Sequence, residues 1–136
     1  MMQNLIPKKE EEERRLKALA EYRILGTKPE SCYDDITKIA ASTCNVPISL
    51  MTLVDKDKQW FKSKVGLEIN ETRRDWSFCT HAIQENSPLI IQDAFQDERF
   101  INNPLVTGDP KIRFYAGFPL KNRDGNKLGT LCVIDR

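Results

Sequence analysis

The residues that could do chemistry gather in one short stretch, SFCTHAIQEN at positions 77–86. It holds His81, the single histidine of the chain, two positions after Cys79. A thiol beside an imidazole is the pattern of an activated nucleophile. On a helix, however, residues two apart do not face each other. The sequence therefore favours His81 as a pocket-wall or hydrogen-bonded residue over a catalytic dyad with Cys79.

The cysteines do not form a recognisable metal or redox motif. Cys32, Cys44, Cys79 and Cys132 lie far apart, and none belongs to a CxxC pair. This spacing argues against a zinc site and against a thioredoxin-type motif. With one histidine a His-rich metal site is excluded, so we expect no metal site and mostly buried, reduced thiols.

The start of the stretch could instead bind an anion. Ser77 is a typical helix cap, and the amides that follow a cap point outward at the positive end of the helix dipole. The arginines that could add positive charge, if the fold brings them near, are Arg73, Arg74, Arg99 and Arg113. The alternative is that these arginines are solvated or paired with acidic residues, namely Glu71, Asp75, Asp93 or Asp97.

Aromatic side chains could stack on a planar ligand. The candidates are Phe61, Trp76, Phe78, Phe114 and Tyr115, although aromatic residues at strand and helix spacing more often belong to the core. The candidate ligand-binding residues are therefore Phe61, Phe78, Cys79, His81, Arg99, Arg113 and Tyr115. We predict no catalytic residue, and the sequence does not identify a cofactor.

Composition limits the class of protein. The chain has 136 residues, 40% of them apolar, and a net charge of +1. These values predict one ordinary globular domain and give no reason to expect nucleic acid or an anionic membrane as partner. No apolar run reaches the length of a membrane span, and the charged N-terminus lacks a signal-peptide core. We therefore expect a cytoplasmic protein.

Two helices are predicted before the first strand. The charge run KKEEEERR at 8–15 leads into an apolar stripe that ends near Ile24, with Gly26 as a stop. Residues 27–30, TKPE, fit a capping box for a second helix that runs to about Asn45. The spacing predicts for this second helix an inward face of Tyr33, Ile36, Ile39, Ala40 and Thr43.

Strands are predicted over 48–54, 59–65, 89–92, 113–121 and 127–134, with a loop at 66–75. The segments 48–54 and 127–134 are apolar on both faces, which is typical of central strands. Asp124-Gly125 is a strong hairpin signal, and Pro119 must lie on an edge side or at a bulge. The order of elements predicts an α+β fold with a largely antiparallel central sheet of five to six strands and helices on its faces.

Several motifs together resemble a GAF domain. They are RLKALAEYRILGTKPE, ISLMTLVDKDKQWFKSKVGL, ETRRDWSFCTHAI, PLIIQDAFQDERFINNPLV, IRFYAGFPL and GNKLGTLCVIDR, in this order. The resemblance is greatest to the bacterial type that precedes histidine kinases and diguanylate cyclases. It implies a PAS-like sheet that encloses a small-molecule pocket. It divides the chain into a charged extension or start of the first helix at 1–13 and a GAF-like domain at 14–136 that lacks its C-terminal helix.

The implied function is that of a non-catalytic, small-molecule-sensing regulatory module in signal transduction. It would act as a homodimer, through its first helix, on an output domain that this fragment does not contain. The ligand is not identified: the Asn-Lys-x-Phe-Asp-Glu signature of cyclic-nucleotide binders is absent, and Cys79 lacks the adjacent histidine of bilin binders. Two alternatives stay open, a ligand-free dimerisation or spacer domain and an enzyme similar to free methionine sulfoxide reductases.

Overall fold

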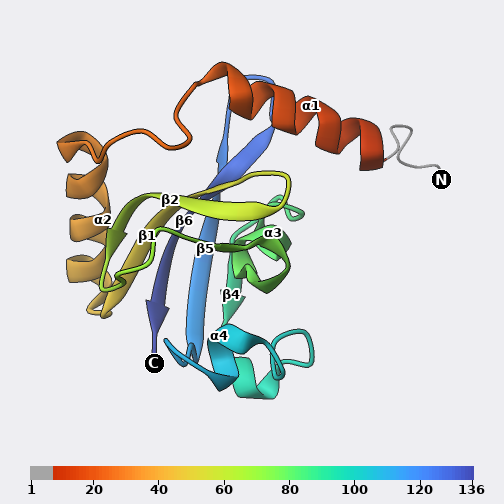
Figure 1. Cartoon of the computed structure of the whole chain (residues 1–136). Helices are drawn as coiled ribbons and strands as arrows, with labels where there is room; N and C mark the ends of the chain where they lie inside the picture. The colour runs from red at the N-terminus through yellow and green to blue at the C-terminus, as the bar shows by residue number, and fades with distance from the viewer. Residues whose placement is uncertain (1–7) are drawn as a thin grey trace.

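A six-stranded antiparallel sheet forms the centre of the computed structural model, which describes residues 8–136 (Figure 1). The strands are β1 (Ile48–Val54), β2 (Lys58–Val65), β3 (Glu71–Arg73), β4 (Leu89–Ile91), β5 (Phe114–Lys121) and β6 (Lys127–Asp135). The helices are α1 (Lys8–Glu21), α2 (Ser31–Cys44), α3 (Phe78–Ala82) and α4 (Pro104–Thr107), with 3₁₀ turns η1 (Arg74–Trp76) and η2 (Ala94–Gln96). The predicted α+β fold is therefore confirmed.

The order of strands in the sheet is β3-β2-β1-β6-β5-β4. The two segments predicted as central are indeed the middle strands: β1 is buried along its whole length and pairs with β2 and β6. Close approach of β1 and β6 depends on Gly129, because a Cβ there would lie 1.8 Å from the carbonyl oxygen of Thr52. β5 joins β6 through the predicted hairpin, in which Gly125 has a φ of +84°.

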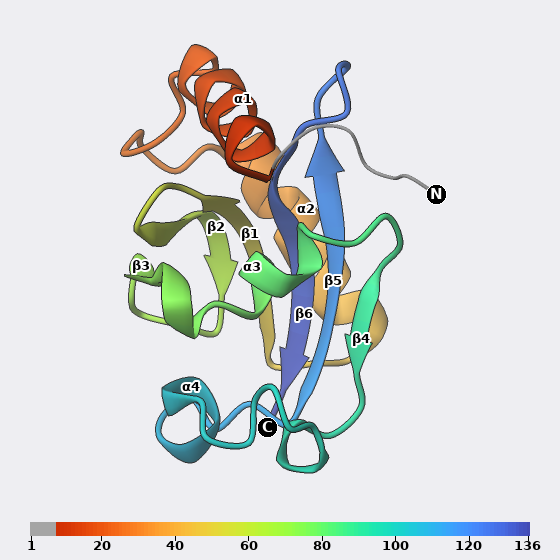
Figure 2. The same ribbon diagram turned by 90° about the vertical axis from the view of Figure 1, so that its right-hand side faces the viewer.

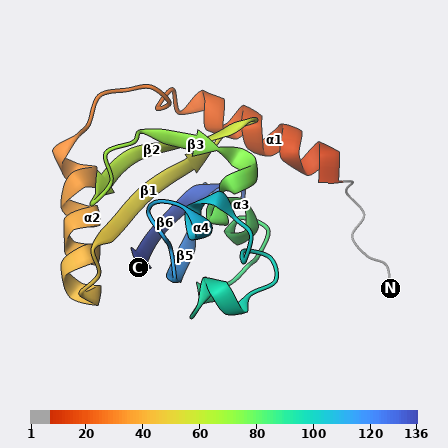
Figure 3. The ribbon, with the colours of Figure 1, turned by 60° about the horizontal axis from the view of Figure 1, so that its bottom comes forward.

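Helices cover the sheet unequally. Figure 3 shows the curved sheet between α2 on one side and α3 with α4 on the other, and Figure 2 shows α3 lying in front of the middle strands. α1 crosses one end of the sheet (Figure 1). Because the strands are amphipathic or fully apolar, each covered face buries a separate group of side chains. The larger core, beneath α3 and α4, is where the candidate site lies.

The second core lies beneath α1. Leu19 of α1 is 1% exposed and packs with Leu53, Trp60 and Leu128 at the ends of three strands. The apolar stripe of α1 is therefore used within the chain. Its polar first turns begin at Lys8, so residues 8–13 are helical, while residues 1–7 of the predicted extension lie outside the described part.

The start of α2 corrects one prediction. Glu30 precedes the helix without a capping hydrogen bond, and Thr27 donates to the carbonyl of Ile24, so the capping box at 27–30 does not form. The carboxylate of Glu30 instead lies 2.7 Å from the buried Nζ of Lys62. An ion pair with a distant strand has replaced the local cap. The end of α2 is as predicted, with Asn45 in the left-handed conformation.

The inward face of α2 is also corrected. Ile36 and Ile39 are 43% and 64% exposed, whereas Thr37 and Ala41 are buried. Thr37 faces inward because its hydroxyl contacts Ser63 of β2 at 2.7 Å. A polar residue can be buried when it has an internal hydrogen-bond partner, so hydrophobicity alone does not identify the buried face of α2.

Smaller elements complete the sheet. The predicted loop at 66–75 contains β3, whose three residues pair with β2. The edge position predicted for Pro119 is confirmed, because β4 pairs only with residues 115–117 of β5. Within residues 8–136, no helix combines the length and the apolar character needed to cross a membrane.

Candidate functional site

The short helix α3 is positioned by hydrogen bonds at its start. Ser77 caps it as predicted: its Oγ accepts from the amide of Thr80 and donates to Oε1 of Gln59 on β2 at 2.8 Å. The Thr80 hydroxyl donates to the carbonyl of Arg74. The helix ends at Ala82, so it is shorter than the stretch 77–86 suggested. A single turn of helix provides a fixed wall for the core, without the longer dipole that anion binding would use.

A cluster of thiol and hydroxyl groups lies beneath α3. The sulfur of Cys79 is 3.0 Å from Oγ1 of Thr130, and the hydroxyl of Tyr115 donates to it at 3.2 Å. Thr130 in turn lies 3.2 Å from the hydroxyl of Thr52. The thiol of Cys132, on the same face of β6 as Thr130, lines the same cavity as Cys79. Four strand residues thus surround one helical thiol.

Tyr115 reaches the thiol because Gly117 leaves room for it. A Cβ at Gly117 would lie 2.1 Å from the tyrosine Oη. The Tyr115 side chain is completely buried, so its hydroxyl needs an internal partner, and the Cys79 sulfur provides one.

The pKa values of this cluster are perturbed in opposite directions. Burial raises the pKa of Cys79, but hydrogen bonds from Cys132, Thr130, Thr52 and Tyr115 outweigh it and lower that pKa to about 6. The pKa of Cys132 is raised well above its ordinary value by its hydrogen bond to Cys79, by burial and by the charge of Cys79. The first proton of the thiol pair is therefore lost from Cys79.

The cluster forms the floor of a small apolar cavity. Its volume is about 20 Å³, enough for about one water molecule. Both thiols, together with the hydroxyl-bearing Tyr115, belong to its wall. Within the described part of the chain its other lining residues are all uncharged: Leu50, Gln59, Phe61, Leu67, Ile69, Thr72, Phe78, Leu105, Pro110, Ile112 and Ile134. The cavity can therefore accommodate a small uncharged molecule and offers no counter-charge to an ion.

Four of the seven predicted ligand-binding residues meet at this cavity, namely Phe61, Phe78, Cys79 and Tyr115. The other three lie elsewhere. His81 is half-buried with its ring edge-on to Phe100 at 4.9 Å. Its pKa is lowered, mainly by burial and also by the charge of Arg99.

The two arginines of the predicted set do not face the cavity. Arg99 pairs with Asp97 at 2.7 Å, which was the alternative to anion binding. Arg113 stacks over the ring of Phe95 and donates to the carbonyls of Val106 and Ile112. That the seven residues bind a ligand together remains a prediction. The structure brings only the aromatic and thiol members of the set to the cavity.

Sequence reasoning missed Cys132, Thr130 and Thr52 as members of the cluster. Alternation along β6 places Thr130 and Cys132 on one face of the strand, so the sequence was sufficient to predict that these two side chains are neighbours. Their meeting with Cys79 was not, because it joins residues 51 positions apart or more through the packing of α3.

A larger hollow of about 220 Å³ lies on the other side, between α2 and β2. Its lysines suggest an anion site, but Lys62 Nζ already contacts Thr27, the carbonyl of Lys28 and the carboxylate of Glu30. Lys64 donates to the carbonyls of Glu68 and Ile69 and to Asn70. An ammonium group has three donors, so Lys62 and Lys64 are satisfied internally, while Lys38, the third lysine of the lining, is exposed.

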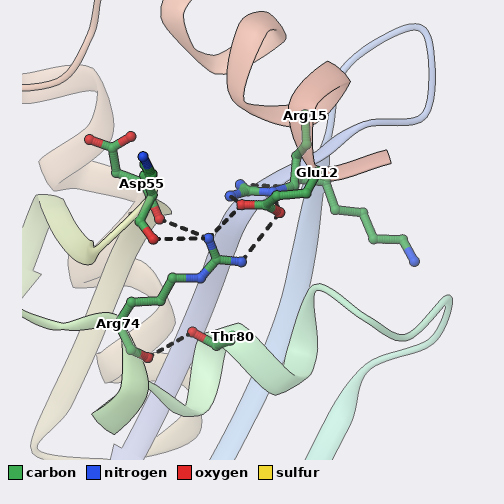
Figure 4. Close-up of polar contacts among 7 residues, drawn as sticks. Glu12, Arg15, Asp55, Arg74 and Thr80 are labelled. Carbon is green, nitrogen blue, oxygen red and sulfur yellow. Dashed lines mark hydrogen bonds and ion pairs between the residues drawn. The ribbon is translucent and has the colours of Figure 1, made fainter. Parts of the chain in front are cut away.

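Arg74 connects α3 with α1, as Figure 4 shows. Its guanidinium binds the carboxylate of Glu12 and the carbonyl of Asp55, while its own carbonyl accepts from Thr80. Glu12 also binds Arg15 at 2.9 Å. Burial alone would raise the pKa of Glu12, but the hydrogen bonds from Arg15 and Arg74 outweigh it and lower that pKa to about 2. We call Glu12, Arg15 and Arg74 the α1 clamp.

An antiparallel sheet with a cavity beneath a short helix is the architecture of the GAF domain. The model of that family matches residues 28–136, so the chain belongs to the GAF domain family. The chain is 40% identical over 130 residues to the cyclic di-GMP phosphodiesterase PA2567 of Pseudomonas aeruginosa. That match covers 96% of this chain but only 22% of the relative.

Solved structures agree on the fold. The GAF domain of a phosphoenolpyruvate-protein phosphotransferase from Coxiella burnetii is similar with a TM-score of 0.63 and 11% identity, over 95% of this chain and 80% of that one. The type II free methionine-R-sulfoxide reductase of Thermoplasma acidophilum has a TM-score of 0.62 and 12% identity, over 86% of this chain and 77% of that one. Both likenesses concern the fold alone.

Proposed function

We propose that this GAF domain is a non-catalytic sensor that takes a small, uncharged molecule into the cavity beneath α3. The observation that carries the proposal is the cavity itself, whose apolar wall ends on the Cys79 and Tyr115 groups. A ligand larger than water requires part of the wall to move. The segments that carry Leu67 and Ile69, between β2 and β3, are the short connections best able to do so.

A route for the signal supports a regulatory role. α3 forms the wall of the cavity, its Thr80 holds the carbonyl of Arg74, and the Arg74 side chain holds Glu12 of α1. A ligand that displaces α3 would therefore disturb the α1 clamp. This contact chain gives the cavity a physical connection to the first helix, which lies at the end of the sheet (Figure 1).

The output would lie in a separate domain of a cytoplasmic signalling protein. The relative from P. aeruginosa is a cyclic di-GMP phosphodiesterase of which this domain spans 22%, which supports an attached output domain in cyclic di-GMP signalling. Dimerisation through α1 is a further part of the proposal. Because Ala18 and Leu19 are buried on the sheet, such a dimer would pair the charged faces of two α1 helices. Sedimentation at low and high salt tests this, since charged contacts weaken as salt rises.

A thermal-shift screen tests ligand binding. Small uncharged compounds should raise the melting temperature, while cyclic nucleotides and nitrate should not, because the cavity wall holds no positively charged side chain to pair with an anion. Ile69→Trp at the exposed rim should abolish the shift, whereas Ile90→Trp, at a comparably exposed position on β4, should leave it intact. A shift caused only by charged compounds, or retained in Ile69→Trp, would contradict the proposed site.

The small volume of the cavity favours a second candidate, a ligand-free spacer or dimerisation domain. Phe78 stacks on Phe100 at 4.0 Å and helps to close this core. This candidate predicts that no compound in a broad panel raises the melting temperature, and that Ile69→Trp leaves an attached output domain unaffected.

A third candidate is an activity similar to that of free methionine sulfoxide reductases, because two thiols line the cavity. A free amino acid carries two charges, and the cavity wall holds no Lys, Arg, His, Asp or Glu side chain to pair with them. We therefore expect no turnover of free methionine sulfoxide with a thiol reductant. Measured turnover that Cys79→Ser abolishes would replace the sensor proposal by the enzymatic one.

A further inference from the structure

We infer that Cys79 and Cys132 form an oxidisable dithiol, which a small peroxide converts into an intramolecular disulfide. This modification site goes beyond the proposed sensing function and does not rest on it, because the reaction needs the two thiols and a peroxide but no bound ligand. It rests on where the two thiols lie, on what surrounds them and on what can reach them.

The two sulfurs come from elements that face each other across the larger core. Cys79 lies on α3, and Cys132 lies in the middle of β6, paired with Leu50 on one side and Gly117 on the other. Both line the same cavity, and Thr130, two positions before Cys132 on the same face of β6, contacts the Cys79 sulfur at 3.0 Å. Cys132 is therefore placed to resolve an oxidised Cys79 without any rearrangement of the sheet.

The surroundings stabilise the thiolate form of Cys79. The hydroxyl of Tyr115 donates to its sulfur, and the hydroxyl of Thr130 lies within hydrogen-bonding distance. A thiolate is the reactive form of cysteine, and hydrogen bonds to the charged form favour it. Cys32 and Cys44 are both exposed and serve as internal comparisons within the same chain.

The size of the cavity selects the oxidant. Both thiols are buried, and the space above them holds about one water molecule. Hydrogen peroxide is uncharged and only slightly larger than water, so of the common oxidants it requires the least movement of the cavity wall. Disulfide oxidants of the glutathione type are large and charged, and they would reach Cys32 and Cys44 before the buried pair.

The reaction balances with one peroxide. The Cys79 sulfur attacks one peroxide oxygen, the S–O bond forms, the O–O bond breaks, and the departing hydroxide takes the former Cys79 proton as water. The Cys132 sulfur then attacks the Cys79 sulfur, the S–S bond forms and the S–O bond breaks. The second hydroxide leaves as water with the Cys132 proton. The two thiols lose two electrons, which reduce the peroxide to two waters.

Mass spectrometry of the full chain tests the inference. In a Cys32→Ser/Cys44→Ser chain, hydrogen peroxide should lower the mass by two hydrogen atoms, and peptide mapping should join the peptides of Cys79 and Cys132. With Cys132→Ser added, the mass should instead rise by one oxygen atom, which peptide mapping should place on Cys79 as a sulfenic acid. The inference is overturned if the pair stays reduced at peroxide concentrations that fully oxidise Cys32 and Cys44 in the unmodified chain, or if Cys132 is oxidised first.

A conservative variant keeps the test decisive if Cys132→Ser fails to fold. Tyr115→Phe retains the ring and removes one donor to the thiolate, so disulfide formation should slow by about tenfold, the effect of one hydrogen bond to a charged group. An unchanged rate in Tyr115→Phe would contradict the assigned role of the hydroxyl. Failure of oxidation leaves the binding of uncharged compounds untouched, so the thermal-shift screen and this experiment fail separately.

Discussion

The α1 clamp provides a prediction whose size follows from the structure. Glu12→Gln removes the carboxylate that holds Arg15 and Arg74. The lowering of the Glu12 pKa from 4.5 to about 2 corresponds to at most about 3.4 kcal/mol. Because 33% of the Glu12 side chain is exposed, screening by solvent reduces the expected loss to about 1–2 kcal/mol.

The loss should be local to the first helix and dependent on pH. Since the folded pKa of Glu12 is depressed, its contribution is complete above pH 4.5 and disappears as the pH falls towards 2. At pH 7, hydrogen exchange should show that the free energy of opening α1 is lower in the variant by the amount given above. In urea unfolding, the difference in unfolding free energy between wild type and variant should become smaller below pH 4.5.

Glu13→Gln is the matched control, because it removes the same charge from an exposed position on the same helical turn. It should change α1 exchange by less than about 0.5 kcal/mol, the range typical of surface substitutions. Equal exchange in Glu12→Gln and Glu13→Gln would refute the clamp, as would a stability gap that persists unchanged down to pH 2.

Three further predictions concern the cores and the thiol. Leu19→Ala should lower the free energy of unfolding by about 2–4 kcal/mol in urea, because it empties a fully buried site beneath α1. Gly129→Ala should lower the melting temperature far more than Gly125→Ala: its new Cβ meets the Thr52 carbonyl, whereas Gly125 has open space and only a positive φ. The rate of Cys79 oxidation should rise between pH 5 and 7 and then level off, because its pKa is lowered to about 6; a rate that first rises above pH 8 would contradict this.

Local pattern was sufficient to predict the elements whose identity depends on their own residues. Alternation and apolar density located β1 and β6 as central strands, and Asp124-Gly125 located the last hairpin. These signals extend over only a few residues. The prediction from them holds because the sheet buries both faces of its middle strands, as their apolar composition indicates.

Predictions failed where a distant partner decides the local structure. Glu30 pairs with Lys62 instead of capping α2, and Thr37 turns inward to meet Ser63. The α1 clamp joins residues 62 positions apart. Periodicity carries no information about such contacts, because each is set by the packing of whole elements.

The candidate site was predicted in part for the same reason. The stretch 77–86 indicated where α3 and Cys79 would lie, and the aromatic members Phe61, Phe78 and Tyr115 do meet at the cavity. Arg113 does not, because it follows the irregular segment after α4 and stacks on Phe95. The partners of Cys79 on the strands emerge only once α3 is packed on the sheet.

Amide NMR spectra of the chain titrated with small uncharged compounds test the central proposal most directly. We predict shifts confined to the cavity, above all at Phe78, Cys79 and Tyr115, that are lost in Ile69→Trp and kept in Ile90→Trp. Shifts centred on the hollow beside Lys62, or no shift with any compound, would contradict the sensor proposal.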